Sequence, residues 1–111
     1  MTDLEMLTLA AKVAGTNILY LEEKDYFIDS SDTYWNPLEY DEDAFRLMVA
    51  LGMTVKFIDI DDKVCVQVFN KDNIDLTLHV VGSDRMGDVR RAVVRFAAWL
   101  AKSNVESSLD F

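Results

Sequence analysis

Three β-strand candidates separated by very short polar turns constrain this chain more than any other feature. The segments MTVKFIDID, KVCVQVF and IDLTLHVV are separated only by DDK and NKDN. Turns this short can join neighbouring antiparallel strands, whereas a parallel crossover needs about a dozen residues or more. The β-branched and aromatic residues that dominate the segments favour strands. The sequence therefore predicts an antiparallel meander in its second half.

The third of these candidates alternates strictly between apolar and polar residues. One side of the predicted strand carries Ile74, Leu76, Leu78 and Val80, and the other side carries Asp75, Thr77 and His79. This alternation is typical of a strand with one covered and one open face. We expect the aliphatic side to be covered and His79, on the less apolar side, to be an ordinary strand residue.

Residues 3–14 have the signals of an α-helix at both ends. Thr2 followed by Glu5 has the capping-box spacing, and Gly15 supplies a C-terminal stop. Apart from three polar residues in one narrow sector, nearly every position is apolar. That arc is wider than a helix covered on one side needs. We therefore expect this helix to pack on two sides within a monomer or to take part in a homodimer.

Two more helices are predicted, over residues 41–51 and 87–103. The first is apolar on every side after its acidic start and is followed by Gly52, so we expect it to be largely buried and Gly52 to be left-handed. Residues 104–111 are predicted to form a flexible tail. The last helix carries apolar residues at core spacing, namely Val89, Val93, Phe96 and Leu100.

The order of the elements predicts the fold class. Two short strands, TNILYLEE and DYFID, precede the second helix, which gives the order α-β-β-α-β-β-β-α. Three apolar helices and about five strands fit one mainly antiparallel sheet with helices on both faces, an α+β (α-β-α) sandwich. Half of the 111 residues are apolar, enough for one core. We predict a single domain over residues 1–103.

The formal net charge of −9 is unevenly spread along the chain. Residues 1–62 hold 4 Lys or Arg against 14 Asp or Glu, whereas residues 63–111 hold 7 against 6. An acidic surface repels nucleic acid and membrane surfaces, and it favours solubility or a basic partner. No signal peptide and no membrane-spanning run is present in the sequence, so we expect a soluble protein of the cytoplasm.

The stretch TYWNPLEYDEDAFRLMVALG combines an aromatic pair, an Asn-Pro turn and an acidic helix start. Asn36 before Pro37 favours an extended backbone with a side-chain cap, and carboxylates are favoured at the positive end of a helix. Trp35, with its tyrosine neighbours, either covers the core or forms an aromatic wall for a planar ligand. We expect a structural clamp at Trp35-Asn36-Pro37 and a partner-facing acidic part beyond it.

Candidate binding residues combine this stretch with the basic side of the last helix. The arginines are expected chiefly to pair with the acidic half, and a small anionic ligand could use them instead. The candidates are Tyr34, Trp35, Glu39, Asp41, Glu42, Asp43, Arg90, Arg91 and Arg95. Carboxylates of this region could gather around a hard cation, but the glycine-containing calcium loop is absent and we predict no metal and no cofactor.

Catalytic motifs are missing from the sequence. Cys65 is the only cysteine and is expected to be a buried thiol, and His79 has no second nitrogen ligand at a recognisable spacing. Four glycines, at positions 15, 52, 82 and 87, cannot build a phosphate-binding loop or a nucleophile elbow. The sequence therefore does not predict an enzyme.

Two segments together resemble a known family. YWNPLEYDEDAFRLMVALGM is similar to the Trp-Asn-Pro-Leu, acidic loop and helix of the phage ABA sandwich domain, a family of small phage and prophage proteins related to NinX-like phage proteins. RRAVVRFAAWLAKS is similar to the helix that closes that domain. The first segment departs from the family pattern at one point, because DED stands where the family often has a glycine, near Glu42. The resemblance spans residues 2–103. It implies an α-β-α sandwich and no particular reaction.

These observations lead to two function hypotheses. The first is a non-enzymatic phage or prophage accessory protein that binds a host or phage protein in the bacterial cytoplasm through its acidic half. The second is a small-molecule-binding protein that sequesters an anionic or nucleotide ligand with Trp35 and the arginines. An enzyme remains only as a residual hypothesis.

Overall fold

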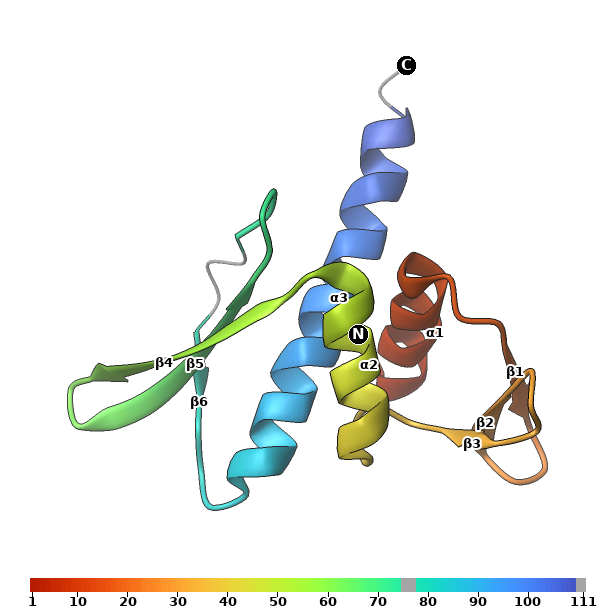
Figure 1. Ribbon diagram of the computed structural model, residues 1–111, viewed down its shortest axis with the longest axis horizontal. Helices are drawn as coiled ribbons and strands as arrows, with labels where there is room; N and C mark the ends of the chain where they lie inside the picture. The colour runs from red at the N-terminus through yellow and green to blue at the C-terminus, as the bar shows by residue number, and fades with distance from the viewer. Residues whose placement is uncertain (75–77, 110–111) are drawn as a thin grey trace.

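The helices occupy the middle of the molecule, and two separate sheets flank them (Figure 1). The computed structural model describes the backbone of residues 1–74 and 78–109, and the side chains of this part up to residue 103. Its elements are α1 (Asp3–Ala14), β1 (Ile18–Leu21), β2 (Tyr26–Asp29), β3 (Tyr34–Trp35), α2 (Asp41–Leu51), β4 (Thr54–Ile60), β5 (Lys63–Phe69), β6 (His79–Val80) and α3 (Arg85–Leu109). The expected α+β class is confirmed.

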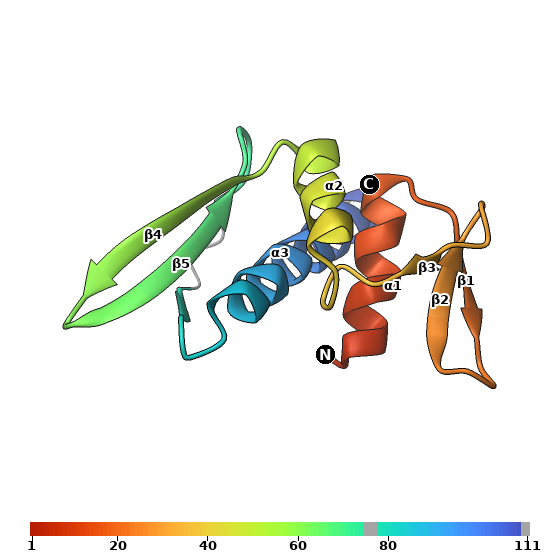
Figure 2. The ribbon, with the colours of Figure 1, turned by 60° about the horizontal axis from the view of Figure 1, so that its bottom comes forward.

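The predicted single sheet of about five strands is wrong. The described residues form two three-stranded antiparallel sheets, a first sheet in the order β1-β2-β3 and a second in the order β4-β5-β6. The additional strand β3 pairs with β2, with Trp35 opposite Phe27. Figure 2 shows the two sheets on opposite sides of the helices. The two meanders are separated along the chain by α2, and each sheet packs on the helices from its own side.

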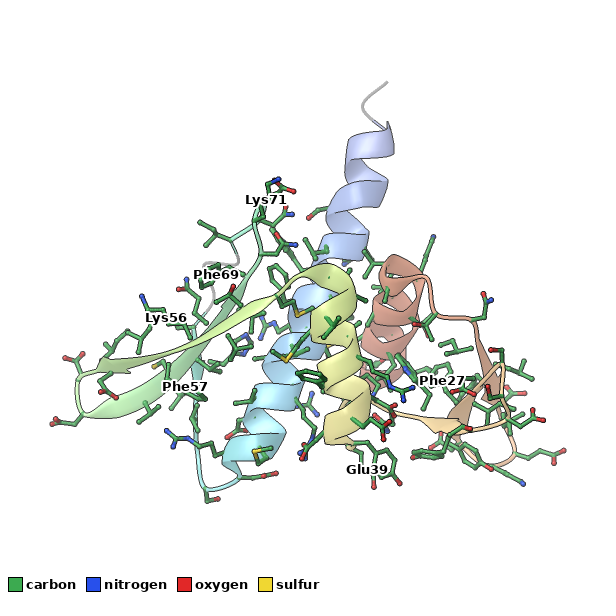
Figure 3. The ribbon with its side chains drawn as sticks, viewed as in Figure 1. Phe27, Glu39, Lys56, Phe57, Phe69 and Lys71 are labelled. Carbon is green, nitrogen blue, oxygen red and sulfur yellow. The ribbon has the colours of Figure 1, made fainter. Side chains whose placement is uncertain are left out.

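The core is centred on α3. Ala92, Val93, Phe96 and Ala97 are fully buried and form one cluster with residues of α1, α2 and the second sheet. Alanine lets neighbouring backbones approach closely, because its side chain is a single methyl group. The first sheet joins this cluster through Phe27, which Figure 3 shows pointing from the strands toward the helices.

Local turn and capping signals were predicted well. The Thr2 hydroxyl accepts the Glu5 N–H at 3.1 Å, and Gly15 ends α1 with φ 71°. Gly52 ends α2 with φ 61°, and its N–H donates to the carbonyls of the last turn, as expected. The helix α3 begins at Arg85 and continues to Leu109, beyond the predicted bounds of 87–103.

The hairpin of β4 and β5 follows the predicted meander. Its turn residues Asp61 and Asp62 have φ values of 49° and 64°. Two consecutive left-handed residues form the turn that matches the right-handed twist of a two-stranded hairpin. The hairpin extends away from the helices, and Figure 3 shows Lys56 and Phe57 on it. The Arg85 guanidinium covers the Phe57 ring at 5.0 Å.

The expectation that α2 is largely buried is wrong. Among its residues only Ala44 and Leu47 are buried, whereas Phe45 and Val49 are 63% and 66% exposed. The helix lies on the outside of the helical layer, so only one of its sides meets α3 and α1. An apolar sequence on the outward side therefore remains open to solvent.

The covered side of the third meander strand was also predicted wrongly. In the described part of the segment, Ile74, Leu78 and Val80 are exposed, whereas His79 lies opposite Val66 and shares its side of the sheet. Val66 belongs to the core cluster with α3. In the part of the chain that the structure describes, the helices lie on one side of the second sheet only, which leaves its other side uncovered. Predictions for residues 75–77 lie outside the described residues.

The helix α1 packs on two sides within one chain, which is the first of the two arrangements expected from its wide apolar arc. It contacts α3 along most of its length and also contacts α2. Met6 is buried, and Leu9 and Val13 pack against the core.

Among the helices that the structure describes, none combines the length and the apolar character that a membrane crossing needs.

Candidate functional site

Trp35 is part of the core. The side chain is 7% exposed, and its ring meets Phe27 edge to face with centroids 6.2 Å apart. The register of β2 with β3 places these two residues opposite one another. Pro37, two residues later, is fully buried. These contacts agree with a structural clamp, in which the aromatic ring and the proline fix the chain ahead of α2.

Asn36 organises the turn between β3 and α2. Its side-chain oxygen accepts the Leu38 N–H at 3.0 Å, and its carbonyl accepts the N–H groups of Glu39 and Tyr40 at 3.1 and 2.9 Å. The Asn36 N–H in turn donates to the Asp43 carboxylate at 2.9 Å. Asn36 therefore acts as the predicted cap, and the first turn of α2 supports it from the other side.

The acidic residues of the stretch have different roles. Asp43, expected to face a partner, is half-buried and satisfies the Asn36 N–H, so its role is structural. Asp41 accepts from Arg90 at 2.7 Å, and Glu42 accepts from Arg46 at 2.6 Å. The carboxylates of Asp41 and Glu42 are more than half exposed. The accessible acidic group consists of Glu39, Asp41 and Glu42.

The three candidate arginines do not form one site. Arg90 joins the acidic corner, where Nε donates to the Leu38 carbonyl at 2.9 Å and Nη1 to Asp41. Its side chain is only 17% exposed, so it ties α3 to the turn. Arg91 pairs with Asp3, at 3.0 and 3.3 Å, on a different side of α3. Arg95 has no ion pair among the described residues.

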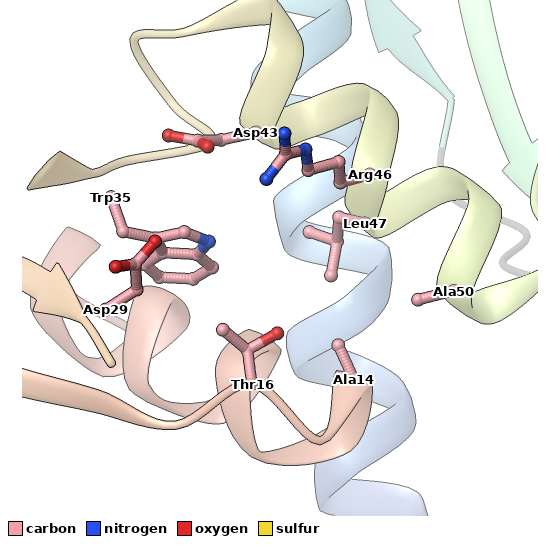
Figure 4. Close-up of a pocket in the computed structure, with 8 residues that line it drawn as sticks. All are labelled: Ala14, Thr16, Asp29, Trp35, Asp43, Arg46, Leu47 and Ala50. Atoms are coloured by element: carbon pink, nitrogen blue, oxygen red, sulfur yellow. The ribbon is translucent and has the colours of Figure 1, made fainter. Parts of the chain in front are cut away.

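A small cavity lies beside the Trp35 ring, between the first sheet and α2 (Figure 4). Its volume is about 130 Å³, below the roughly 300–1,000 Å³ of most small-molecule sites. The lining residues are Ala14, Thr16, Asp29, Trp35, Asp43, Arg46, Leu47 and Ala50. The candidate arginines 90, 91 and 95 are not among them, so the ring and these cations do not act on one ligand here.

A larger, open hollow of about 460 Å³ lies outside this cavity and is mainly acidic. Tyr34 and Tyr40 meet edge to face there, with centroids 5.2 Å apart, and the Tyr34 hydroxyl donates to Glu39 at 3.2 Å. The lining includes Asp29, Ser31, Thr33, Tyr34, Tyr40, Asp41, Glu42, Asp43 and Arg46. One of these residues holds the backbone of its own turn, since the Asp29 carboxylate accepts the Ser31 and Thr33 N–H groups. Within the described residues no group of three metal-ligating side chains is found.

The outward side of α2 was missed from the sequence. Glu42, Phe45, Arg46 and Val49 share this side of the helix, because positions three and four apart lie one turn away from each other. Tyr40, just before the helix, is 46% exposed. The signal that could have found this surface is the presence of apolar residues on every side of α2, more than a single contact face needs.

Comparison of the chain with protein-family models, with curated proteins and with solved structures finds no match. The resemblance to the phage ABA sandwich domain therefore stays a prediction.

The thiol of Cys65 is buried and forms no disulfide, as expected.

Proposed function

We propose that the protein is a non-enzymatic binding protein that holds a basic protein partner on the outward side of α2. The observation that carries the proposal is the exposure of Phe45 and Val49, 63% and 66%, one helical turn apart and beside Glu42. Large apolar side chains at this spacing are the anchors with which a helix occupies a partner's groove. Burying them on a partner removes apolar surface from water.

The charge around these anchors supports a basic partner. Residues 1–62 carry 14 acidic against 4 basic residues, and Glu39, Asp41 and Glu42 expose carboxylates at the start of α2. A partner with a basic rim around an apolar groove would be attracted over a distance and held in one orientation. Such an interaction weakens with added salt.

The biological setting is part of the same proposal. The similarity of two segments to phage ABA sandwich proteins favours a phage or prophage accessory protein that acts in the bacterial cytoplasm. Its partner is then a host or phage protein. The alternative, an anionic or nucleotide ligand held by Trp35, is supported less well, because the ring is buried beside a cavity of only about 130 Å³.

The decisive experiment is capture of partners from bacterial host lysate with matched variants. In Phe45→Ser/Val49→Ser both anchors are lost, whereas Leu19→Ser removes a similarly exposed apolar residue on β1, which is 60% exposed. We expect the wild type and the Leu19 variant to retain the same partner and the double variant to lose it. Retention by the double variant, with its fold intact by circular dichroism, would contradict the proposal.

The electrostatic part is tested separately. Glu39→Gln/Glu42→Gln removes two exposed carboxylates and leaves the structural Asp41–Arg90 pair in place. We expect slower association with the captured partner and a weaker dependence of the association rate on salt. An unchanged rate and salt dependence would remove the acidic corner from the interface.

A further inference from the structure

The middle of α3 is exposed along a single stripe. Between residues 91 and 102 its exposed positions are Arg91, Arg95, Trp99 and Lys102, and the others are buried. Counted from Arg91, the other three lie 4, 8 and 11 residues further on, and positions at these separations share one side of a helix, so this stripe is continuous. It follows the central helix of the fold on the side that α1, α2 and the second sheet leave open.

A groove of about 460 Å³ lies along this stripe. Figure 2 shows α3 between β6 on one side and the N-terminus on the other. The lining residues are Met1, Met6, His79, Arg91, Arg95 and Lys102. Among these described lining residues the polar side chains are those of His79, Arg91, Arg95 and Lys102, and none of them is a carboxylate. The charge of this groove is therefore opposite to the net charge of −9 of the protein.

The cations of the groove differ in how they are held. Both terminal nitrogens of Arg91 donate hydrogen bonds to the Asp3 carboxylate. These hydrogen bonds, together with the positive charge of Arg91, lower the pKa of the Asp3 carboxyl. One guanidinium is therefore positioned by a fixed partner. Arg95 and Lys102 are exposed and have no ion pair with the described residues. Their charge remains available to a ligand.

We propose that this groove binds a small polyanion with at least two phosphate or carboxylate groups. The guanidinium fork of Arg95 matches the oxygen spacing of either group, and Lys102 supplies a mobile point charge about 10 Å further along the helix. Met1 and Met6 add an apolar wall for the body of the ligand. The groove volume lies within the range of small-molecule sites.

A small ligand fits this groove better than a nucleic acid. The acidic half of the chain repels a long polyanion, but at physiological salt this repulsion is screened beyond about 8 Å. A compact anion inside the groove therefore interacts mainly with the adjacent cations. The residues involved are separate from Phe45 and Val49, so this site goes beyond the proposed protein contact and is tested independently of it.

The test is titration of the full chain with inorganic pyrophosphate and with citrate, followed by calorimetry and by amide NMR shifts. These probes distinguish a phosphate from a carboxylate ligand. We expect saturable binding of at least one probe, with shifts concentrated at residues 91–102. The variant Arg95→Ala/Lys102→Ala should weaken binding by about tenfold or more. Absence of saturable binding, or shifts spread over the surface, would overturn the proposal.

A matched control separates a site from general charge. Lys56→Ala/Lys63→Ala lowers the net charge by the same amount on the β4–β5 hairpin, away from the groove. We expect its affinity to stay within about twofold of the wild type. Equal losses in both double variants would show non-specific attraction and overturn the site. If the Arg95 variant folds poorly, Lys102→Ala alone must still weaken binding more than Lys56→Ala does.

Discussion

The helices α2 and α3 both carry large apolar residues, but the fold uses them in opposite ways. In α3 the residues Ala92, Val93 and Phe96 are completely buried, whereas α2 exposes Phe45 and Val49 to solvent. The difference follows from position, because α3 has neighbours on three sides and α2 lies at the outside. Apolar composition thus predicts that a helix forms, while the number of neighbours decides which of its sides are buried.

The two helices are also fixed by different means. Lateral packing holds α3, whereas α2 is held strongly at its ends, by the Asn36–Asp43 contact before it and by left-handed Gly52 after it. A helix fixed at its ends can keep one side free for a partner. Substitutions in the two helices should therefore have effects of very different size.

The largest contrast is expected between two phenylalanines. Phe96→Ala should lower the free energy of unfolding by about 3–5 kcal/mol, because it leaves a cavity in the fully buried centre of the core. Phe45→Ala should change it by no more than about 0.5 kcal/mol, because the side chain is already in water. Urea denaturation of both variants measures the difference. Equal losses would show that α2 is as tightly covered as α3.

A medium effect is expected at the start of α2. Asp43→Ala leaves the half-buried Asn36 N–H without its acceptor and should cost about 1–3 kcal/mol. Glu42→Ala is the matched control, because it removes only the exposed pair with Arg46 and should cost about 1 kcal/mol or less. Denaturation midpoints compare the two. A Glu42 variant as unstable as the Asp43 variant would remove the distinction between structural and accessible carboxylates.

The end of α2 should show a smaller loss. Gly52→Ala should cost about 1 kcal/mol, since φ is 61° and a side chain disfavours this left-handed backbone. An added Cβ would meet no atom within 4 Å, so the cost comes from the backbone alone. Gly52→Asn, which tolerates this conformation better, should lose less in thermal denaturation. An Ala variant as stable as the wild type would argue against the left-handed end.

The smallest effect is expected at the surface of α3, in the Asp3–Arg91 pair. This contact lowers the pKa of Asp3 below its ordinary value of 3.8, so the unfolded chain takes up the proton first as the pH falls. The stabilisation is complete above the unfolded pKa and is lost as the pH drops through the lower, folded pKa. Its size should be about 1 kcal/mol or less, because both side chains are half exposed.

Unfolding of the wild type and Asp3→Asn between about pH 6 and pH 2 measures this contribution. The stability difference between the two proteins should be constant at higher pH and should shrink under acid conditions. A difference that grows as the pH falls would give the opposite sign and contradict the lowered pKa.

Local signals in the sequence were reliable because their physics is local. The cap at Thr2, the glycine ends at Gly15 and Gly52 and the short turn at Asp61 each depend on a few neighbouring residues. The number of sheets was not predictable, because it depends on which side of the helices each meander packs. The strand β3 is only two residues long and exists through its pairing with β2, so no periodic pattern could mark it.

The candidate site shows the same limit. The turn at Asn36 and the clamp role of Trp35 follow from neighbouring residues, and both agree with the structure. The contact from Asp43 back to Asn36 depends on how the turn folds over the helix, and Asp43 was predicted to face a partner instead. The groove lined by His79 and Lys102 could not be predicted from the sequence, because its existence depends on which elements flank α3.

The central position of α3 has a consequence for synthesis on the ribosome. Every other described element precedes α3 in the chain, so α1, α2 and both sheets leave the exit tunnel before the helix that covers their apolar sides. The Asp3–Arg91 contact joins residues 88 positions apart. Local hairpins can form early, but closing so long a loop is slow and comes late. The nascent chain therefore exposes the apolar sides of these elements until α3 has left the tunnel, and exposed apolar surface of this kind is what chaperones recognise.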